Sequence, residues 1–219
     1  MRKINPFKKI INGVVDDNIY KRIVWMYVSF LLIFISVTIL SYFLLPDAFL
    51  RGKHPIVSRL EFSPALWISA LQIFGYNLIP TSLIIGANLI AHKYRISKEK
   101  FVPIGYIAFL GIIIPAALYL GTWSFEVVTE APSLYFRLIG TFDVFHYSGF
   151  LELSAYLLAA AVSYKFTLWY SDGKKIIKIK KWKDIKLATS EKIVFILVFV
   201  LLFCSAFIES YRIIQLTRL

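Results

Sequence analysis

Residues 23–45 read IVWMYVSFLLIFISVTILSYFLL and contain no Asp, Glu, Lys, Arg or His. At a rise of about 1.5 Å per residue, a helix of this length crosses a hydrocarbon core of about 30 Å. A segment surrounded by lipid must satisfy its own backbone hydrogen bonds, and a helix does so without another strand or chain. This stretch therefore predicts a transmembrane helix.

Four more apolar stretches follow, at residues 66–91, 102–122, 144–168 and 193–214. The stretch at 144–168 is the least regular, because it begins in mixed sequence and contains Glu152. Together the five stretches predict an all-α, polytopic transmembrane helix bundle of about five spans. We expect residues 23–219 to form one transmembrane domain.

The composition of the whole chain agrees with a multi-pass membrane protein. Of its 219 residues, 58% are hydrophobic and 17% are charged, and the mean hydropathy is +0.69. Soluble domains average about 45–50% apolar and about 25% charged residues. The lone cysteine, Cys204, excludes an intramolecular disulfide and a Cys-based metal site. Topology explains the net charge of +12 more simply than nucleic-acid binding does, so we expect no nucleic-acid partner.

The basic residues are unevenly distributed between the connecting segments. Residues 1–22, 92–100 and 165–192 hold nineteen of the 25 Lys and Arg residues. Cytoplasmic loops of membrane proteins carry an excess of Lys and Arg. The distribution predicts a cell-membrane protein with a cytoplasmic N-terminus and an external C-terminus.

Two of these basic segments have a pattern of their own. In residues 1–22, Asn5 and Pro6 begin an amphipathic pattern that predicts a helix lying on the inner membrane surface. In the turn at 165–192, Lys alternates with Ile, which favours contact with anionic lipid headgroups. Docking of an acidic protein or of nucleic acid is the alternative. The candidate contact residues are Lys174, Lys175, Lys178, Lys180 and Lys181.

Polar residues inside the second apolar stretch share one helical face. Asn77, Thr81, Ile84 and Asn88 follow the i, i+4, i+7, i+11 spacing, and Pro80 is expected to kink the helix there. A packing seam joined by amide hydrogen bonds is one interpretation. The alternative is a broken helix that lines a substrate path, as in transporters.

Small residues form a comparable stripe in the fourth stretch. Ser148, Glu152, Ala155, Ala159 and Ser163 lie on one helical face, and small residues allow close helix packing. The spacing therefore predicts that Glu152 points into a protein interface and away from lipid.

A carboxyl group at this depth requires a cation or hydrogen-bond donors, or it stays neutral. Candidate partners for Glu152 are Asn77, Arg137 and Arg212. Glu152 is the first candidate functional residue, and a purely structural hydrogen-bonding role is the alternative. Glu209 has Arg212 three residues later, and a local ion pair accounts for it.

His146 lies six residues before Glu152, about 120° away on an ideal helix. The two share a face only if the helix breaks near Gly149. A wetted interfacial histidine is the simpler interpretation, so we expect no metal and no cofactor.

Residues 145–155, FHYSGFLELSA, resemble the stage II sporulation protein M family. That family opens a late membrane helix with His-Gly-x-x-Glu-x-x-Ala, and Gly149, Glu152 and Ala155 match the pattern. Ser148 stands at the position of the family's histidine, and His146 is displaced by two residues. The Asn77-Leu78 pair is similar to the family's Asn-Leu at an early helix. In spore formers, members belong to a membrane complex that drives engulfment with peptidoglycan-degrading partners, so the resemblance implies a role in a complex.

Three functions are weighed from these features. A non-catalytic membrane scaffold or complex subunit explains the short connections and the small-residue stripe. A channel or transporter component, with a polar path lined by Glu152, Asn77 and Asn88, is the alternative. An enzyme is disfavoured, because no nucleophile–base pair or metal-ligand set converges in the sequence. The expected partners are a bilayer with anionic headgroups and either a homo-oligomer or other membrane proteins.

Overall fold

The computed structural model describes residues 6–52, 62–95, 101–125, 130–142, 148–171 and 175–217. The helices are α1 (Pro6–Val14), α2 (Ile19–Leu44), α3 (Leu66–Ala87), α4 (Gly105–Gly121), α5 (Leu134–Phe142), α6 (Gly149–Ser163) and α7 (Thr189–Thr217), with 3₁₀ turns η2 (Tyr164–Phe166) and η3 (Trp182–Asp184). The strands are β1 (Ile90–Arg95), β2 (Phe101–Pro103), β3 (Trp169–Ser171) and β4 (Ile176–Lys178).

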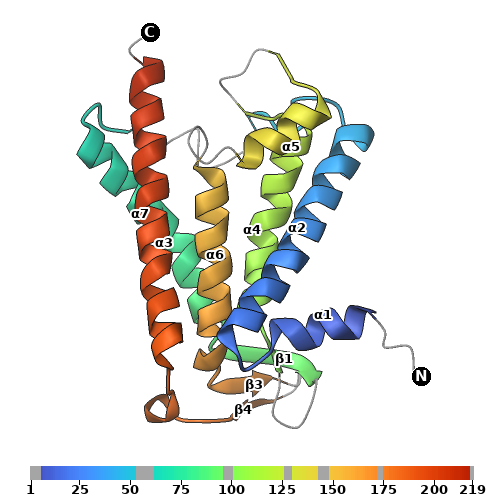
Figure 1. Cartoon of the computed structure of the whole chain (residues 1–219), viewed down its shortest axis with the longest axis vertical. Helices are drawn as coiled ribbons and strands as arrows, with labels where there is room; N and C mark the ends of the chain where they lie inside the picture. Colours follow the sequence, from blue (N-terminus) through green and yellow to red (C-terminus); the bar gives the residue numbers. More distant parts are fainter. Residues whose placement is uncertain are drawn as a thin grey trace.

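Five helices, α2, α3, α4, α6 and α7, run between two ends of the molecule (Figure 1). At one end, here named the sheet end, β1 follows α3, β2 precedes α4, and β3 follows α6. Consecutive long helices therefore run in opposite directions. Helix α1 lies at the sheet end, and α5 lies at the opposite end (Figure 1).

The predicted helical membrane bundle is confirmed, but the predicted five spans are not supported by helix length. Among the described residues, three helices, α2, α3 and α7, are long and apolar enough to cross a membrane. Helix α4 has 17 residues and α6 has 15, which correspond to about 25 Å and about 22 Å. The predicted stretches are longer than the helices because the apolar sequence continues into β1, β2 and η2.

The outward faces of the long helices are apolar. Leu32 of α2, Leu71 of α3 and Ile196 of α7 are each more than half exposed. Large exposed apolar side chains recur along these three helices, which fits helices that face lipid. The protein is therefore a membrane protein.

The four-stranded sheet was not predicted, since the sequence indicated turns at 92–100 and 165–192. Its order is β2-β1-β3-β4. Strand β1 pairs antiparallel with β2 and parallel with β3, where Ala91 lies opposite Tyr170, and β3 pairs antiparallel with β4. The sheet thus joins the connection between α3 and α4 to the connection that follows α6.

Two glycines allow α4 to approach its neighbours closely. A Cβ on Gly105 would lie 2.3 Å from the carbonyl oxygen of Ile84, and a Cβ on Gly121 would lie 2.5 Å from that of Thr38. Any larger residue would push α4 away from α3 or α2. These contacts hold α4 against both helices.

Helix α1 is amphipathic, with Lys8 and Lys9 exposed and Ile10 and Ile11 half-buried. The Tyr106 hydroxyl donates to the Val14 carbonyl at 2.8 Å, which ties the end of α1 to α4. The expected cap, Asn5, lies outside the described residues.

Candidate functional site

Helix α6 forms the centre of the bundle. Every residue from Leu153 to Ser163 is buried, and Ala155, Ala159, Ala160 and Ala161 are fully inaccessible. Helices α2, α3, α4 and α7 all contact α6, and Figure 1 shows α6 between α7 and α4. A helix that is apolar on all sides is expected in such a buried position.

Glu152 lies in the first turn of α6 and is half-buried. Its Oε1 accepts a hydrogen bond from the Tyr156 hydroxyl, one turn along the same helix, at 2.5 Å. Glu209 of α7 lies within electrostatic range of both Glu152 and Arg212. The hydrogen bond thus comes from a residue that was not among the predicted partners Asn77, Arg137 and Arg212.

The start of α6 packs against α7. The Ser205 hydroxyl donates to the Ser148 carbonyl at 3.3 Å. Ser148 is the N-cap residue of α6, but its side chain makes no capping bond. Gly149 is exposed, and a Cβ there would have no atom within 4 Å, so the glycine is not required for packing. His146 lies outside the described residues.

The other end of α6 is joined to α3 by an amide. The Asn88 Nδ2 donates to the Ala160 carbonyl at 3.0 Å and to the Ser163 hydroxyl at 2.6 Å. The Ser163 hydroxyl in turn donates to the Ala159 carbonyl at 2.6 Å. Asn88 is fully buried, so it serves as a hydrogen-bonded packing residue between α3 and α6.

Asn77 differs from Asn88, although the two lie on one face of α3. Thr81 and Ile84 between them are buried as the spacing predicts, whereas Asn77 is half-buried. The Asn77 carbonyl accepts from the Thr81 hydroxyl at 2.8 Å. Within the described part of the chain, the buried Asn77 Nδ2 has no hydrogen-bond partner.

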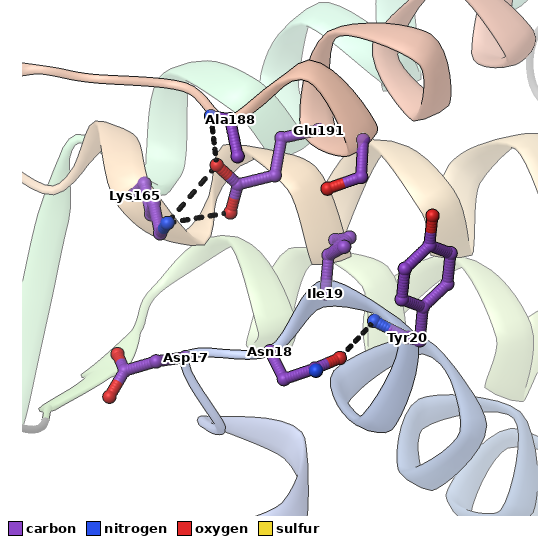
Figure 2. Close-up of a pocket in the computed structure, with 8 residues that line it drawn as sticks. Asp17, Asn18, Ile19, Tyr20, Lys165, Ala188 and Glu191 are labelled. Atoms are coloured by element: carbon purple, nitrogen blue, oxygen red, sulfur yellow. Dashed lines mark hydrogen bonds and ion pairs between the residues drawn. The ribbon is translucent and has the colours of Figure 1, made fainter.

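A buried ionic cluster at the sheet end was missed by the sequence. Arg22 of α2 and Glu191 of α7 are 0% and 1% exposed, and Arg22 Nη2 lies 3.2 Å from Glu191 Oε1. Lys165 Nζ lies 2.9 Å from Glu191 Oε1 and donates to Oε2 at 3.1 Å, as Figure 2 shows. The Ala188 backbone N–H also donates to Oε2, at 2.9 Å.

Arg22 makes further contacts that complete this cluster. Its Nε donates to the Ala161 carbonyl at 2.8 Å, and its Nη1 donates to the Asp16 carbonyl at 2.6 Å. Its guanidinium lies over the Tyr164 ring, 4.8 Å from the centroid. The cluster therefore connects α2, α6 and α7, and each charged group has a partner.

Charged residues at the ends of the apolar stretches did not predict this cluster. Arg22 directly precedes the predicted span 23–45, and Glu191 lies two residues before the span 193–214, where charged residues normally mark the membrane boundary. Their pairing depends on the packing of α2 against α6 and α7, which local sequence does not encode.

A pocket of about 200 Å³ lies beside the cluster. Its lining residues are Asp17, Asn18, Ile19, Tyr20, Lys165, Ala188, Ser190 and Glu191, most of them labelled in Figure 2. Lys180 Nζ donates to the Lys165 carbonyl nearby. Burial and the Lys165 charge lower the pKa of Lys180.

The candidate lysines of the 165–192 turn are divided by the structure. Lys175, Lys178 and Lys181 are exposed. Lys180 is half-buried, and its Nζ donates a hydrogen bond to the Lys165 carbonyl. Lys174 lies outside the described residues.

A second arginine is buried at the opposite end. Arg137 of α5 is 2% exposed and pairs with Asp47 at 2.7 Å. Its Nε donates to the Pro132 carbonyl at 2.8 Å, and its Nη1 donates to the Gly121 carbonyl. The guanidinium lies 4.7 Å from the centroid of the Tyr42 ring.

The fold and these contacts define a helical membrane bundle with a buried central helix. Comparisons with protein-family models, with curated proteins and with solved structures find no match to this chain.

Proposed function

We propose that the protein is a non-catalytic scaffold or subunit of a complex in the cell membrane. The observation that supports this is the use of α6, which bears the Gly149–Ala155 motif, in internal packing. Near the end of α6, the Ser163 hydroxyl accepts a hydrogen bond from the Asn88 amide at the end of α3. The resemblance of that motif to the stage II sporulation protein M family favours the same role.

The proposed topology has five crossings, by α2, α3, α4, α6 and α7, with the sheet end in the cytoplasm. The alternating direction of these helices and the basic segments at the sheet end support it. Helices α4 and α6 are shorter than a hydrocarbon core. Their length is acceptable because α6 is surrounded by protein and both helices continue into ordered backbone at the sheet end.

Cysteine accessibility tests this topology. In a Cys204→Ser background, Ser133→Cys is expected to react with an impermeant maleimide added outside intact cells. Ser171→Cys, in β3, is expected to react only after permeabilisation. External labelling of Ser171→Cys, or protection of Ser133→Cys, would contradict the proposal.

The expected partners are a second copy of the chain or other membrane proteins, with no nucleic acid. Size measurement in mild detergent and after in-cell cross-linking tests this. A discrete species larger than the 25.3 kDa chain is expected. A chain that remains monomeric under both conditions would contradict a scaffold role.

A channel or transporter component is the second candidate, favoured by the unpartnered Asn77 Nδ2 and by Glu209 near Glu152. Two pockets formed by described residues do not include these side chains: one lies beside Glu191, and the other is lined by Leu78, Ile79, Ser82 and Leu83. Proton and cation flux into liposomes decides between the candidates. The scaffold predicts flux equal to empty liposomes, and Glu152→Gln would abolish any flux that depends on a carboxylate path.

A further inference from the structure

The free edge of the sheet carries apolar side chains that nothing in the described chain covers. Ile176, Ile177, Ile179 and Trp182 are 68%, 52%, 42% and 60% exposed. We name residues 175–183 the β4 edge. Among the described strands, β4 pairs with β3 on one side and with no strand on its other side.

Exposed lysines alternate with these apolar residues. Lys175, Lys178, Lys181 and Lys183 are all exposed, and no acidic residue lies within 175–183. Asp184 follows, and its carboxylate accepts a bond from the Lys181 backbone N–H at 2.9 Å. The β4 edge is thus both basic and apolar.

The β4 edge lies where the lipid-facing surface of the bundle begins. Helix α7 starts at Thr189, five residues after η3 ends, and its outward apolar surface begins at Ile193. Figure 1 shows β4 beneath the long helices at the sheet end, the same end as α1.

These properties together favour one partner over the others. A nucleic acid or an acidic protein surface would use the lysines but leave the isoleucines and Trp182 in water. At a headgroup surface, by contrast, Ile and Trp enter the acyl boundary and Lys binds phosphate. The combination of exposed lysines with exposed Ile and Trp side chains therefore favours anionic lipid.

We propose that the β4 edge is an anionic-lipid-binding surface that inserts into the headgroup region of the leaflet at the sheet end. The assignment of that leaflet to the cytoplasmic side rests on the proposed topology. The function of the edge would be to fix the depth of the sheet end in the bilayer.

A fluorescent label tests insertion on the full chain. In a Cys204→Ser background, Ile177→Cys is labelled with bimane and reconstituted into nanodiscs of phosphatidylcholine, alone or mixed with phosphatidylglycerol. Nitroxide lipids serve as quenchers. We expect a blue shift and strong quenching in the anionic discs and weak quenching in the neutral ones.

Charge variants test the role of the lysines. Each basic side chain near an anionic surface contributes a factor of about five to binding. The double variant Lys178→Gln with Lys181→Gln should therefore weaken binding of the β4 edge to anionic lipid about 25-fold. Quenching in anionic discs should then fall to the neutral level. Lys21→Gln with Lys192→Gln removes the same charge from exposed sites on α2 and α7 and should leave quenching unchanged.

The remaining outcomes overturn the proposal. Equal quenching in both lipids would exclude selectivity for anionic headgroups. No quenching in either lipid, with a spectral response to an oligonucleotide or to poly-glutamate, would assign the edge to a polyanion in water. Bimane at Leu32→Cys, on the exposed face of α2, distinguishes failure of the β4 edge proposal from failure of the proposed membrane bundle. If that label is quenched and the Ile177→Cys label is not, the β4 edge proposal fails alone, whereas failure of both refutes the membrane bundle.

Discussion

The two ends of the bundle each bury an arginine, but they neutralise its charge differently. At the sheet end, Arg22 pairs with Glu191, and both are inaccessible. At the opposite end, Arg137 is equally buried, but its partner Asp47 is 58% exposed. Both guanidinium groups also donate to backbone carbonyls and lie over a tyrosine ring.

The difference shows what each charge requires. A buried anion such as Glu191 has exchanged water for Arg22, Lys165 and a backbone N–H, so each group depends on the others. Asp47 retains solvent, so water can replace the arginine. We therefore expect the sheet end to be far more sensitive to the loss of its carboxylate.

The largest effect is expected for Glu191→Gln. The substitution leaves Arg22 buried beside a neutral amide, and breaking a buried ion pair costs about 3–5 kcal/mol. Thermal unfolding in detergent should show a marked fall in midpoint. Glu130→Gln, which removes an exposed carboxylate, is the control. Equal unfolding midpoints for Glu191→Gln and Glu130→Gln would show that the sheet end is not especially sensitive to the loss of its carboxylate.

Arg137→Ala should rank second. It removes donors from the Pro132 and Gly121 carbonyls but leaves no buried charge, because Asp47 is exposed. Unsatisfied buried acceptors cost about 1–3 kcal/mol. The same unfolding assay should place this variant between Glu191→Gln and wild type. A larger loss of stability for Arg137→Ala than for Glu191→Gln would show that the end opposite the sheet is the more sensitive one.

Glu152, in the first turn of α6, lies toward the end opposite the sheet and sharpens the comparison. If it acts as an acceptor for Tyr156, Glu152→Gln should be nearly silent, since the amide keeps an oxygen acceptor. Glu152→Leu removes the acceptor of this hydrogen bond within α6 and should cost about 0.5–1.5 kcal/mol, the net contribution of a typical intramolecular hydrogen bond. Tyr156→Phe is the matched control, and it should equal Glu152→Leu if the pair acts as one unit. Loss of stability in Glu152→Gln would show that the charge itself is required.

Asp47→Asn should have the smallest effect. Exposed ion pairs contribute about 0–1 kcal/mol, and the two carbonyls continue to hold Arg137. Unfolding measured at low and at high salt should give nearly the same midpoints as wild type. A loss comparable to that of Glu191→Gln would show that Asp47 is effectively buried.

The sequence predicted the parts of the fold that depend on local pattern. Helical periodicity placed Thr81 and Ile84 on the buried face of α3, and the small residues of α6 in a helix interface. It failed at the ends, because apolar residues continue from the helices into the strands. Whether residues 90–91 form helix or strand depends on pairing with β3, which lies far along the chain.

The candidate site was predicted less completely. The spacing predicted that the face of α6 with Glu152 and the small residues is buried. That Tyr156 donates the hydrogen bond to Glu152 depends on side-chain rotamers inside the bundle, which the sequence does not give. The pairing of Arg22, Lys165 and Glu191 joins three helices, so it follows only from their tertiary packing.

The parallel pairing of β1 with β3 has a consequence for biogenesis. A ribosome makes α2, α3 and α4 long before it reaches Trp169, so one edge of β1 has no strand to pair with during that interval. The early helices must therefore enter the membrane with their connection still open, and synthesis of α6 delivers the strand that closes it. The sheet can therefore close only after the central helix has been synthesised.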